Sequence, residues 1–166
     1  MKLRVVSIVA LATTSLLFVG CAGRSLPAYE APLKRSQFMK VRTTAYTDTE
    51  SDHRKYSNHN AAGTTLQLGS IRSAAADWAR WPFGTEFLLL STGQVYKVDD
   101  YGWALAGRNT IDLYCPDRRE MNDWGLRQVT IQILKWGDPQ ESYRLLRPRR
   151  DYAHVRRMLY EIERFY

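Results

Sequence analysis

Residues 99–114, DDYGWALAGRNTIDLY, place three aspartates and two glycines between two segments that are typical of β-strands. A carboxyl group at a strand end beside aromatic rings loses hydration, which raises its pKa, and neighbouring acids raise it further. A carboxylic acid of this kind can donate a proton near neutral pH. The stretch therefore indicates an acid/base site, and surface aspartates in turns are the alternative interpretation.

The segments around this stretch predict a mainly β protein. Short apolar runs alternate with turn residues, a pattern that is typical of small barrels. Six such runs predict a small six-stranded closed barrel, with strands at residues 38–46, 71–75, 86–90, 95–98, 110–114 and 129–134. A short helix is expected to close at Asn122–Gly125.

The chain after the barrel predicts a C-terminal amphipathic helix. From Asp151 onward, apolar residues recur at helical spacing, at Val155, Met158, Leu159, Ile162 and Phe165. We interpret the basic run Arg147–Arg150 as a solvated connector capped by Asp151, with contact to phosphate or lipid headgroups as the alternative. Residues 138–166 are therefore expected to form a basic helical extension.

The N-terminus predicts export. Residues 1–20 combine a positive start with an apolar stretch that is too short to span a bilayer comfortably, as in a signal peptide. The segment Phe18–Ala22 resembles the bacterial lipoprotein signal, in which the cysteine, here Cys21, is lipidated. This resemblance implies a lipid-anchored protein of the outer membrane that faces the periplasm, and a plain secretory signal is the alternative. Residues 21–37 are expected to be a lipidated tether.

Charge and cysteine usage narrow the range of partners. The formal net charge is +7, and removal of residues 1–20 with Lys2 and Arg4 lowers it to +5. An exported basic protein meets anionic lipid headgroups and the acidic cell-wall polymer, and we expect no nucleic-acid partner. If Cys21 carries lipid, Cys115 has no disulfide partner. We interpret Cys115 as a small buried core residue rather than a nucleophile.

A set of ordered segments between Thr43 and Leu134 carries a family resemblance. The segments are Thr44–Tyr46, Ala62–Thr64, Ser73–Asp77, Trp81–Thr85, Asp100–Gly102, Gly107–Tyr114, Trp124–Gly125 and Val129–Ile131. In this order they resemble the three-aspartate domain of bacterial cell-wall lytic transglycosylases, both the membrane-bound type A enzymes and the stationary-phase survival proteins. The resemblance implies that residues 38–137 form a double-psi β-barrel domain.

The same resemblance implies a lyase that acts on peptidoglycan glycan strands without a cofactor. It would cleave the β-1,4 bond between N-acetylmuramic acid and N-acetylglucosamine and leave 1,6-anhydromuramoyl products. Asp112 is then the catalytic acid and base. Asp100 raises the pKa of Asp112 or stabilises an oxocarbenium-like charge, and Asp77 fixes the local backbone or binds sugar. The substrate-binding residues implied are Tyr46, Thr64, Tyr101, Trp103 and Tyr114.

The chain also departs from the family pattern, and these departures leave alternatives open. Trp103 stands in place of a glycine, Tyr101 in place of a threonine, and one extra residue precedes Asp112. A non-catalytic cell-wall binding module and a structural envelope lipoprotein are therefore the alternative functions. Strand alternation puts Asp100 in phase with Val98, so Asp99 is expected to lie outside the site.

A metal site is not predicted. The loop after the first expected strand holds His53 and His59 near several acids, at Asp48, Glu50 and Asp52. The spacing of these residues fits no familiar set of metal ligands.

Overall fold

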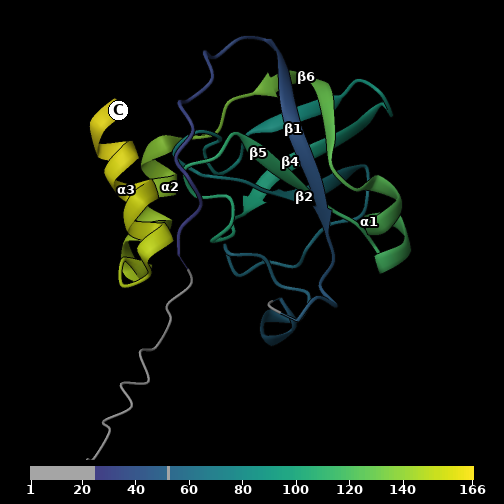
Figure 1. The fold of residues 1–166 in the computed structure, drawn as a ribbon, viewed down its shortest axis with the longest axis horizontal. Helices are drawn as coiled ribbons and strands as arrows, with labels where there is room; N and C mark the ends of the chain where they lie inside the picture. The colour runs from purple at the N-terminus through teal and green to yellow at the C-terminus, as the bar shows by residue number, and fades with distance from the viewer. Residues whose placement is uncertain (1–24, 52) are drawn as a thin grey trace, which may run out of the picture.

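Six β-strands close into a barrel with both parallel and antiparallel pairs (Figure 1). The strands are β1 (Phe38–Tyr46), β2 (Ile71–Ala75), β3 (Glu86–Leu89), β4 (Gln94–Asp100), β5 (Thr110–Tyr114) and β6 (Arg127–Lys135). Around the barrel their order is β1-β5-β2-β4-β3-β6. The pairs β1/β5 and β2/β4 are parallel, and the other four pairs are antiparallel. The expected six-stranded closed barrel is confirmed, while its double-psi crossover stays a prediction.

The structure, a computed structural model, describes residues 25–51 and 53–166. The expected signal peptide and Cys21 lie outside the described residues. Within the described part of the chain, no helix is long and apolar enough to cross a membrane.

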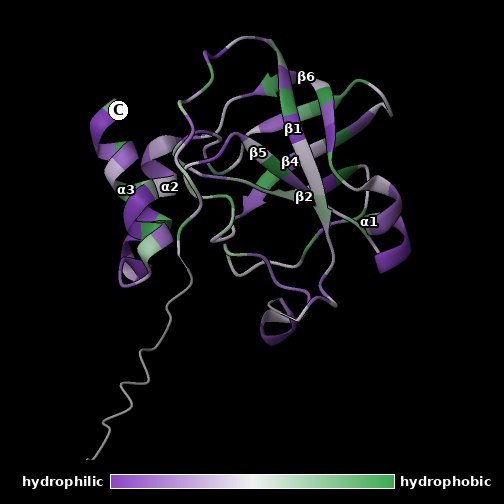
Figure 2. Ribbon diagram, in the orientation of Figure 1, coloured by the Kyte–Doolittle hydropathy of each residue, from purple (hydrophilic) through white to green (hydrophobic). Residues whose placement is uncertain are grey.

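The barrel interior is filled by side chains from alternate strand positions. In β1, Met39, Val41 and Thr43 are buried, and exposed or half-buried residues separate them. This alternation follows from the strand geometry, in which successive side chains point to opposite faces. Apolar residues accordingly run along the barrel strands (Figure 2), and the most buried include Val41, Phe87, Leu89, Ile111 and Ile131.

Three helices complete the described fold. The first, α1 (Arg118–Trp124), begins after Asp117, whose side chain accepts a hydrogen bond from the Glu120 amide, and confirms the expected short helix. The second, α2 (Pro139–Leu146), lies within the expected helical extension, but the sequence pattern predicted no separate helix there. Asp138 caps it in the same way, and a proline occupies its first turn, where the missing amide costs nothing.

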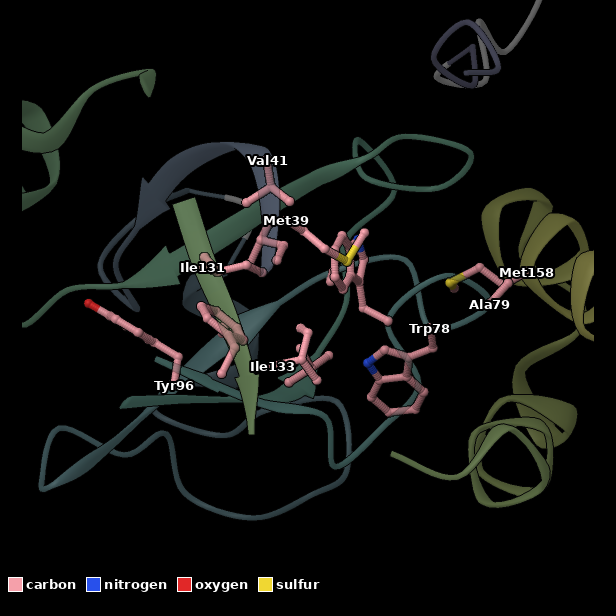
Figure 3. Close-up of a cluster of buried hydrophobic side chains, with 14 of the residues drawn as sticks. Met39, Val41, Trp78, Ala79, Tyr96, Ile131, Ile133 and Met158 are labelled. Carbon is pink, nitrogen blue, oxygen red and sulfur yellow. The ribbon is translucent and has the colours of Figure 1, made fainter. Parts of the chain in front are cut away.

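The third helix, α3 (Ala153–Phe165), confirms the expected C-terminal helix and packs against the barrel. Its side chains Val155, Met158 and Ile162 are buried in the same apolar cluster as the barrel core. Figure 3 shows the Met158 side chain extending from α3 toward the segment that carries Ala79. Helices α2 and α3 lie side by side on one flank of the barrel (Figure 1). Burial of this apolar face joins the extension to the barrel.

The expected tether is in part bound to the domain. Residues 25–36 contain neither helix nor strand, yet the Glu30 amide donates to the carbonyl of Gly107 at 2.8 Å. The Glu30 carboxylate accepts from the amide of Asn109, also at 2.8 Å. Arg157 of α3 donates to the carbonyl of Pro27. This part of the chain is therefore docked on the barrel and on α3, which its composition did not indicate.

Candidate active site

Strand register brings Asp100 and Asp112 to either side of Ala75. Strand β2 lies between β4 and β5, and Ala75 pairs with Asp100 in β4 and with Asp112 in β5. Asp112 also pairs with Thr44 in β1. Directly paired residues place their side chains on the same face of a sheet. The two carboxyl groups therefore share one face, on either side of Ala75.

Asp112 is more accessible than Asp77, Asp99 and Asp100. The Thr44 hydroxyl donates a hydrogen bond of 2.7 Å to Asp112 Oδ1, which orients the carboxyl group. Asp112 is half-buried, whereas Asp77, Asp99 and Asp100 are all buried. A substrate can therefore reach Asp112 most directly.

Asp100 is a buried carboxyl group held by three donors. Its Oδ1 accepts from the amides of Ala61 at 2.8 Å and Tyr101 at 2.9 Å, and its Oδ2 accepts from the Tyr46 hydroxyl at 3.1 Å. Burial raises the pKa of Asp100, and these three hydrogen bonds oppose that rise because they favour the charged form. The Trp78 indole donates to the Asp100 carbonyl and fixes the backbone.

Asp99 is buried beside Asp100, and the strand alternation used to separate the two residues is interrupted here. The register of β2 against β4 shifts between Ala74 and Ala75, so that Asp99 is an extra residue in a β-bulge. A bulge interrupts the alternation from which the expectation was drawn. Asp99 is buried and accepts a hydrogen bond of 2.8 Å from the Ser73 hydroxyl. Burial, with a contribution from the charge of Asp100, raises the pKa of Asp99 to about 6.

The charges of Asp99, Asp100 and Asp112 all affect the Tyr46 hydroxyl. Burial raises the pKa of Tyr46 well above its ordinary value, and the charges of Asp100, Asp99 and Asp112 raise it further. Tyr46 therefore remains a hydrogen-bond donor at any physiological pH. The three carboxyl groups and this hydroxyl form what we call the acidic cluster, which consists of Tyr46, Asp99, Asp100 and Asp112.

The aromatic residues expected to bind sugar have different environments. The Tyr46 and Tyr114 rings pack on each other, with 5.4 Å between centroids, and only 7 % and 4 % of these residues are exposed. Their ring faces are thus occupied by packing. Trp103 is half-buried and Thr64 is exposed, so both can contact a ligand, whereas the half-buried Tyr101 ring also packs on Trp78 with 4.9 Å between centroids.

Asp77 belongs to a different set of contacts. It is fully buried and accepts from the amides of Ala79 at 2.8 Å and Gly107 at 2.5 Å. Its other charged neighbours are Arg80, at 3.8 Å, and Glu161 of α3. Burial raises the pKa of Asp77 to about 6. In this position Asp77 holds the backbone at Gly107, whose φ of +78° favours glycine.

The Cys115 thiol and the possible metal ligands do not form a second reactive site among the described residues. Cys115 is buried, and burial raises its pKa to about 12, so its thiol is protonated and unreactive. Its predicted place in the core is confirmed. Within residues 25–51 and 53–166, no three side chains of the kinds that bind metals gather into a group.

Two residues in or near the acidic cluster, Asp99 and Arg149, were not predicted from the sequence to belong there. Asp99 was set aside because a bulge leaves no local mark in a strand pattern. Arg149 lies close to the acidic cluster through the Ala61 carbonyl, across 88 positions of sequence. The basic run around it predicts a solvated connector, and no short-range pattern distinguishes this arginine from its neighbours.

The fold and the site define a six-stranded mixed β-barrel that carries a cluster of interacting carboxyl groups where β2 and β4 end. Comparison with known proteins adds no relative: no family model matches the chain, and no curated protein matches it. The three-aspartate resemblance thus stays a prediction based on the motifs themselves.

Proposed function

We propose that the protein is a lytic transglycosylase that cleaves the β-1,4 bond between N-acetylmuramic acid and N-acetylglucosamine in peptidoglycan. The observation that carries this proposal is the pairing of a half-buried Asp112 with a buried Asp100 across Ala75. Clusters of carboxyl groups with raised pKa values are typical of acid/base sites. The ordered motifs that resemble the three-aspartate domain support the same reaction.

Asp112 acts first as an acid and then as a base. Its carboxyl proton passes to the glycosidic oxygen, and the bond from that oxygen to the muramoyl C1 breaks, with its electron pair leaving on the oxygen. The muramoyl C6 oxygen attacks C1, and its proton passes to the Asp112 carboxylate. The products are a 1,6-anhydro ring and a free glycan end, no water is consumed, and Asp112 is protonated again. A well-placed acid/base contributes about 10²- to 10⁴-fold in rate.

The rest of the acidic cluster prepares Asp112 for this task. Three donors, at Tyr46, Ala61 and Tyr101, favour the charged form of Asp100 and oppose the effect of its burial. A negative charge nearby disfavours a second one, so Asp100 helps to keep the proton on Asp112. The negative charge of Asp100 also stabilises the positive charge that develops at C1 during cleavage.

The proposed location is the bacterial cell envelope. The segment Phe18–Ala22 resembles a lipoprotein signal, so the lipid on Cys21 anchors the protein to the outer membrane, and the barrel faces the periplasm. In that position the protein meets its glycan substrate without a cofactor or a nucleic-acid partner.

Replacement of Asp112 with asparagine tests the proposal. Asparagine has nearly the same shape and accepts the Thr44 hydrogen bond, but it has no carboxyl proton to donate. We expect the variant to fold and to bind glycan, and to lose anhydromuropeptide release by about 10²-fold or more. The measurement is digestion of purified cell walls followed by mass analysis of the soluble products.

The matched control is Asp123→Asn, because this exposed carboxylate lies in α1 and its ion pair with Arg119 is at the surface. The control should release anhydro products at the wild-type rate. Release at the wild-type rate by Asp112→Asn would show that the assigned mechanism is wrong.

A non-catalytic cell-wall binding module is the second candidate. The half-buried Trp103, in place of a glycine, favours this alternative, because it changes the surface beside the expected catalytic residues. Retention of the wild-type protein on insoluble cell wall, without release of anhydro products, would support this candidate over the enzyme.

A further inference from the structure

The 3-10 turn η2 (Arg147–Arg149) brings one arginine of the C-terminal extension to the loop beside the acidic cluster. Arg149 is half-buried, and its Nη1 donates to the Ala61 carbonyl at 2.5 Å. The side chains on either side of it in the basic run, Arg147 and Arg150, are exposed. The basic run is therefore not a uniformly solvated connector, because Arg149 is committed to a contact inside the fold.

Arg149 contacts both residues whose amides bind Asp100 Oδ1. The Ala61 amide donates to this oxygen at 2.8 Å, and the Tyr101 amide donates to it at 2.9 Å. Arg149 donates to the Ala61 carbonyl, and its guanidinium group also lies close enough to the Tyr101 hydroxyl to lower the pKa of that group. One guanidinium group, with its planar array of donors, thus bridges the two segments that hold Asp100.

The loop that carries Ala61 depends on few other regular contacts. It connects β1 and β2, and the short turn η1 (Arg54–Tyr56) is its one described helical element. Within it, the Asn60 side chain accepts from the amides of Ala62 and Thr64 and shapes a local turn. Ala61 also packs against the barrel core, and Arg149 and Asp100 add the hydrogen bonds that hold its carbonyl and its amide.

We propose that Arg149 is a positioning residue for Asp100, so that the C-terminal extension forms part of the candidate active site. Its importance for catalysis rests on the proposed function, whereas its effect on Asp100 does not. Without Arg149, the Ala61 amide moves away from Asp100 Oδ1 and the carboxylate loses one of its three donors. The loss of this donor favours the protonated form of Asp100.

Several other titratable groups face Asp100, and one of these, Tyr101, is also affected by Arg149. They come from β1, from the loop after it and from β4, and they are Tyr46, His53, Asp99 and Tyr101. Asp112, in β5, belongs to the same cluster, because its charge raises the pKa of Tyr46. Because burial raises the pKa of Tyr101 above its ordinary value, this phenol stays neutral where Asp100 titrates and adds no charge of its own.

The test uses the folded domain with Arg149→Met and follows the Asp100 carboxyl carbon by NMR as the pH is varied. We expect the midpoint of the Asp100 titration to rise by about one pH unit, because one hydrogen-bond donor is lost. Amide hydrogen exchange at Ala61 should become about tenfold faster. Arg150→Met is the matched control, since it removes an exposed arginine one position away. The control should leave both measurements unchanged.

Each outcome decides the proposal. An unchanged Asp100 midpoint in folded Arg149→Met would overturn it. If the methionine variant does not fold, Arg149→Lys carries the test, because lysine keeps the charge but cannot bridge Ala61 and Tyr101. Ala61 exchange that is no faster in this variant than in Arg150→Lys would also overturn it. A wild-type protein that releases no anhydro products, together with a shifted midpoint in Arg149→Met, would remove the proposed function and leave this positioning role intact.

Discussion

Replacement of Asp99 with asparagine should stabilise the folded protein at neutral pH. Burial raises the pKa of Asp99 from its ordinary value of 3.8 to about 6, the Ser73 hydrogen bond opposes this rise, and the charge of Asp100 adds to it. The folded protein therefore binds this proton more tightly than the unfolded chain does. The stability linked to Asp99 is present in full below about pH 4 and is lost as the pH rises through about 6.

The size of the effect follows from the two pKa values. A rise of about two pKa units corresponds to about 3 kcal/mol in the free energy of unfolding at pH 7. Asparagine removes this cost because it has no charge, and it still accepts the Ser73 hydrogen bond. Asp99 and Asp100 interact, so the same substitution lowers the pKa of Asp100 as well. We expect a net gain of about 1–3 kcal/mol at pH 7.

Urea unfolding at several pH values measures this gain. The difference in unfolding free energy between Asp99→Asn and the wild type should be small near about pH 4 and should grow until about pH 7. Asp123→Asn serves as the control, because its exposed carboxylate should give no such growth. A difference between Asp99→Asn and the wild type that stays constant over the whole pH range would refute the reasoning.

Two further predictions concern the core and the anchor. Met158 is fully buried between α3 and the barrel, so Met158→Ala should lower the free energy of unfolding by about 2–5 kcal/mol, measured by chemical denaturation. Cell-wall binding per folded molecule should be unchanged, and a loss of binding without a loss of stability would contradict a purely structural helix. Cys21→Ala should leave the protein without lipid and free in the periplasm, and unchanged membrane fractionation of this variant would refute the lipid anchor.

Buried aspartates that lower the stability of the fold at neutral pH are informative about function. Asp77 and Asp99 both have a pKa raised to about 6, and each therefore weakens the fold at neutral pH. Their surroundings differ, because Asp77 holds the Gly107 backbone, whereas Asp99 adjoins the two acids that flank Ala75. Groups that lower stability and lie together are typical of functional sites. The acidic cluster is therefore the best place on this barrel to look for acid/base chemistry.

Local patterns were enough to predict most of the elements. All six strands and the helices α1 and α3 were expected near their observed positions, because alternation and helical spacing are properties of neighbouring residues. The helix α2 was not expected, although Asp138 and Pro139 mark its start. Its eight residues bury only Ser142 and Leu146, which is too weak a periodicity to recognise. The amphipathic face of α3 was recognised because it buries four apolar side chains at regular spacing.

The candidate site was predictable in part. Asp100 and Asp112 were expected from the motifs. Their placement on either side of Ala75 depends on the order of strands in the barrel. The position of Asp99 depends on a bulge, and that of Arg149 on a contact 88 residues away in sequence. The binding of Glu30 to Gly107 and Asn109, within the expected tether, is likewise a long-range contact.

The sequence by itself determined the strands, two of the three helices and the residues that can carry acid/base chemistry, because backbone geometry turns short-range patterns into local structure. The tertiary structure alone decided how these residues share an environment. Closure of the barrel set Asp100 and Asp112 on one face and left Asp112 the more accessible of the two. Packing of the C-terminal extension brought Arg149 to Ala61. Burial and proximity govern the pKa of a carboxyl group, and both arise only when distant segments of the chain meet.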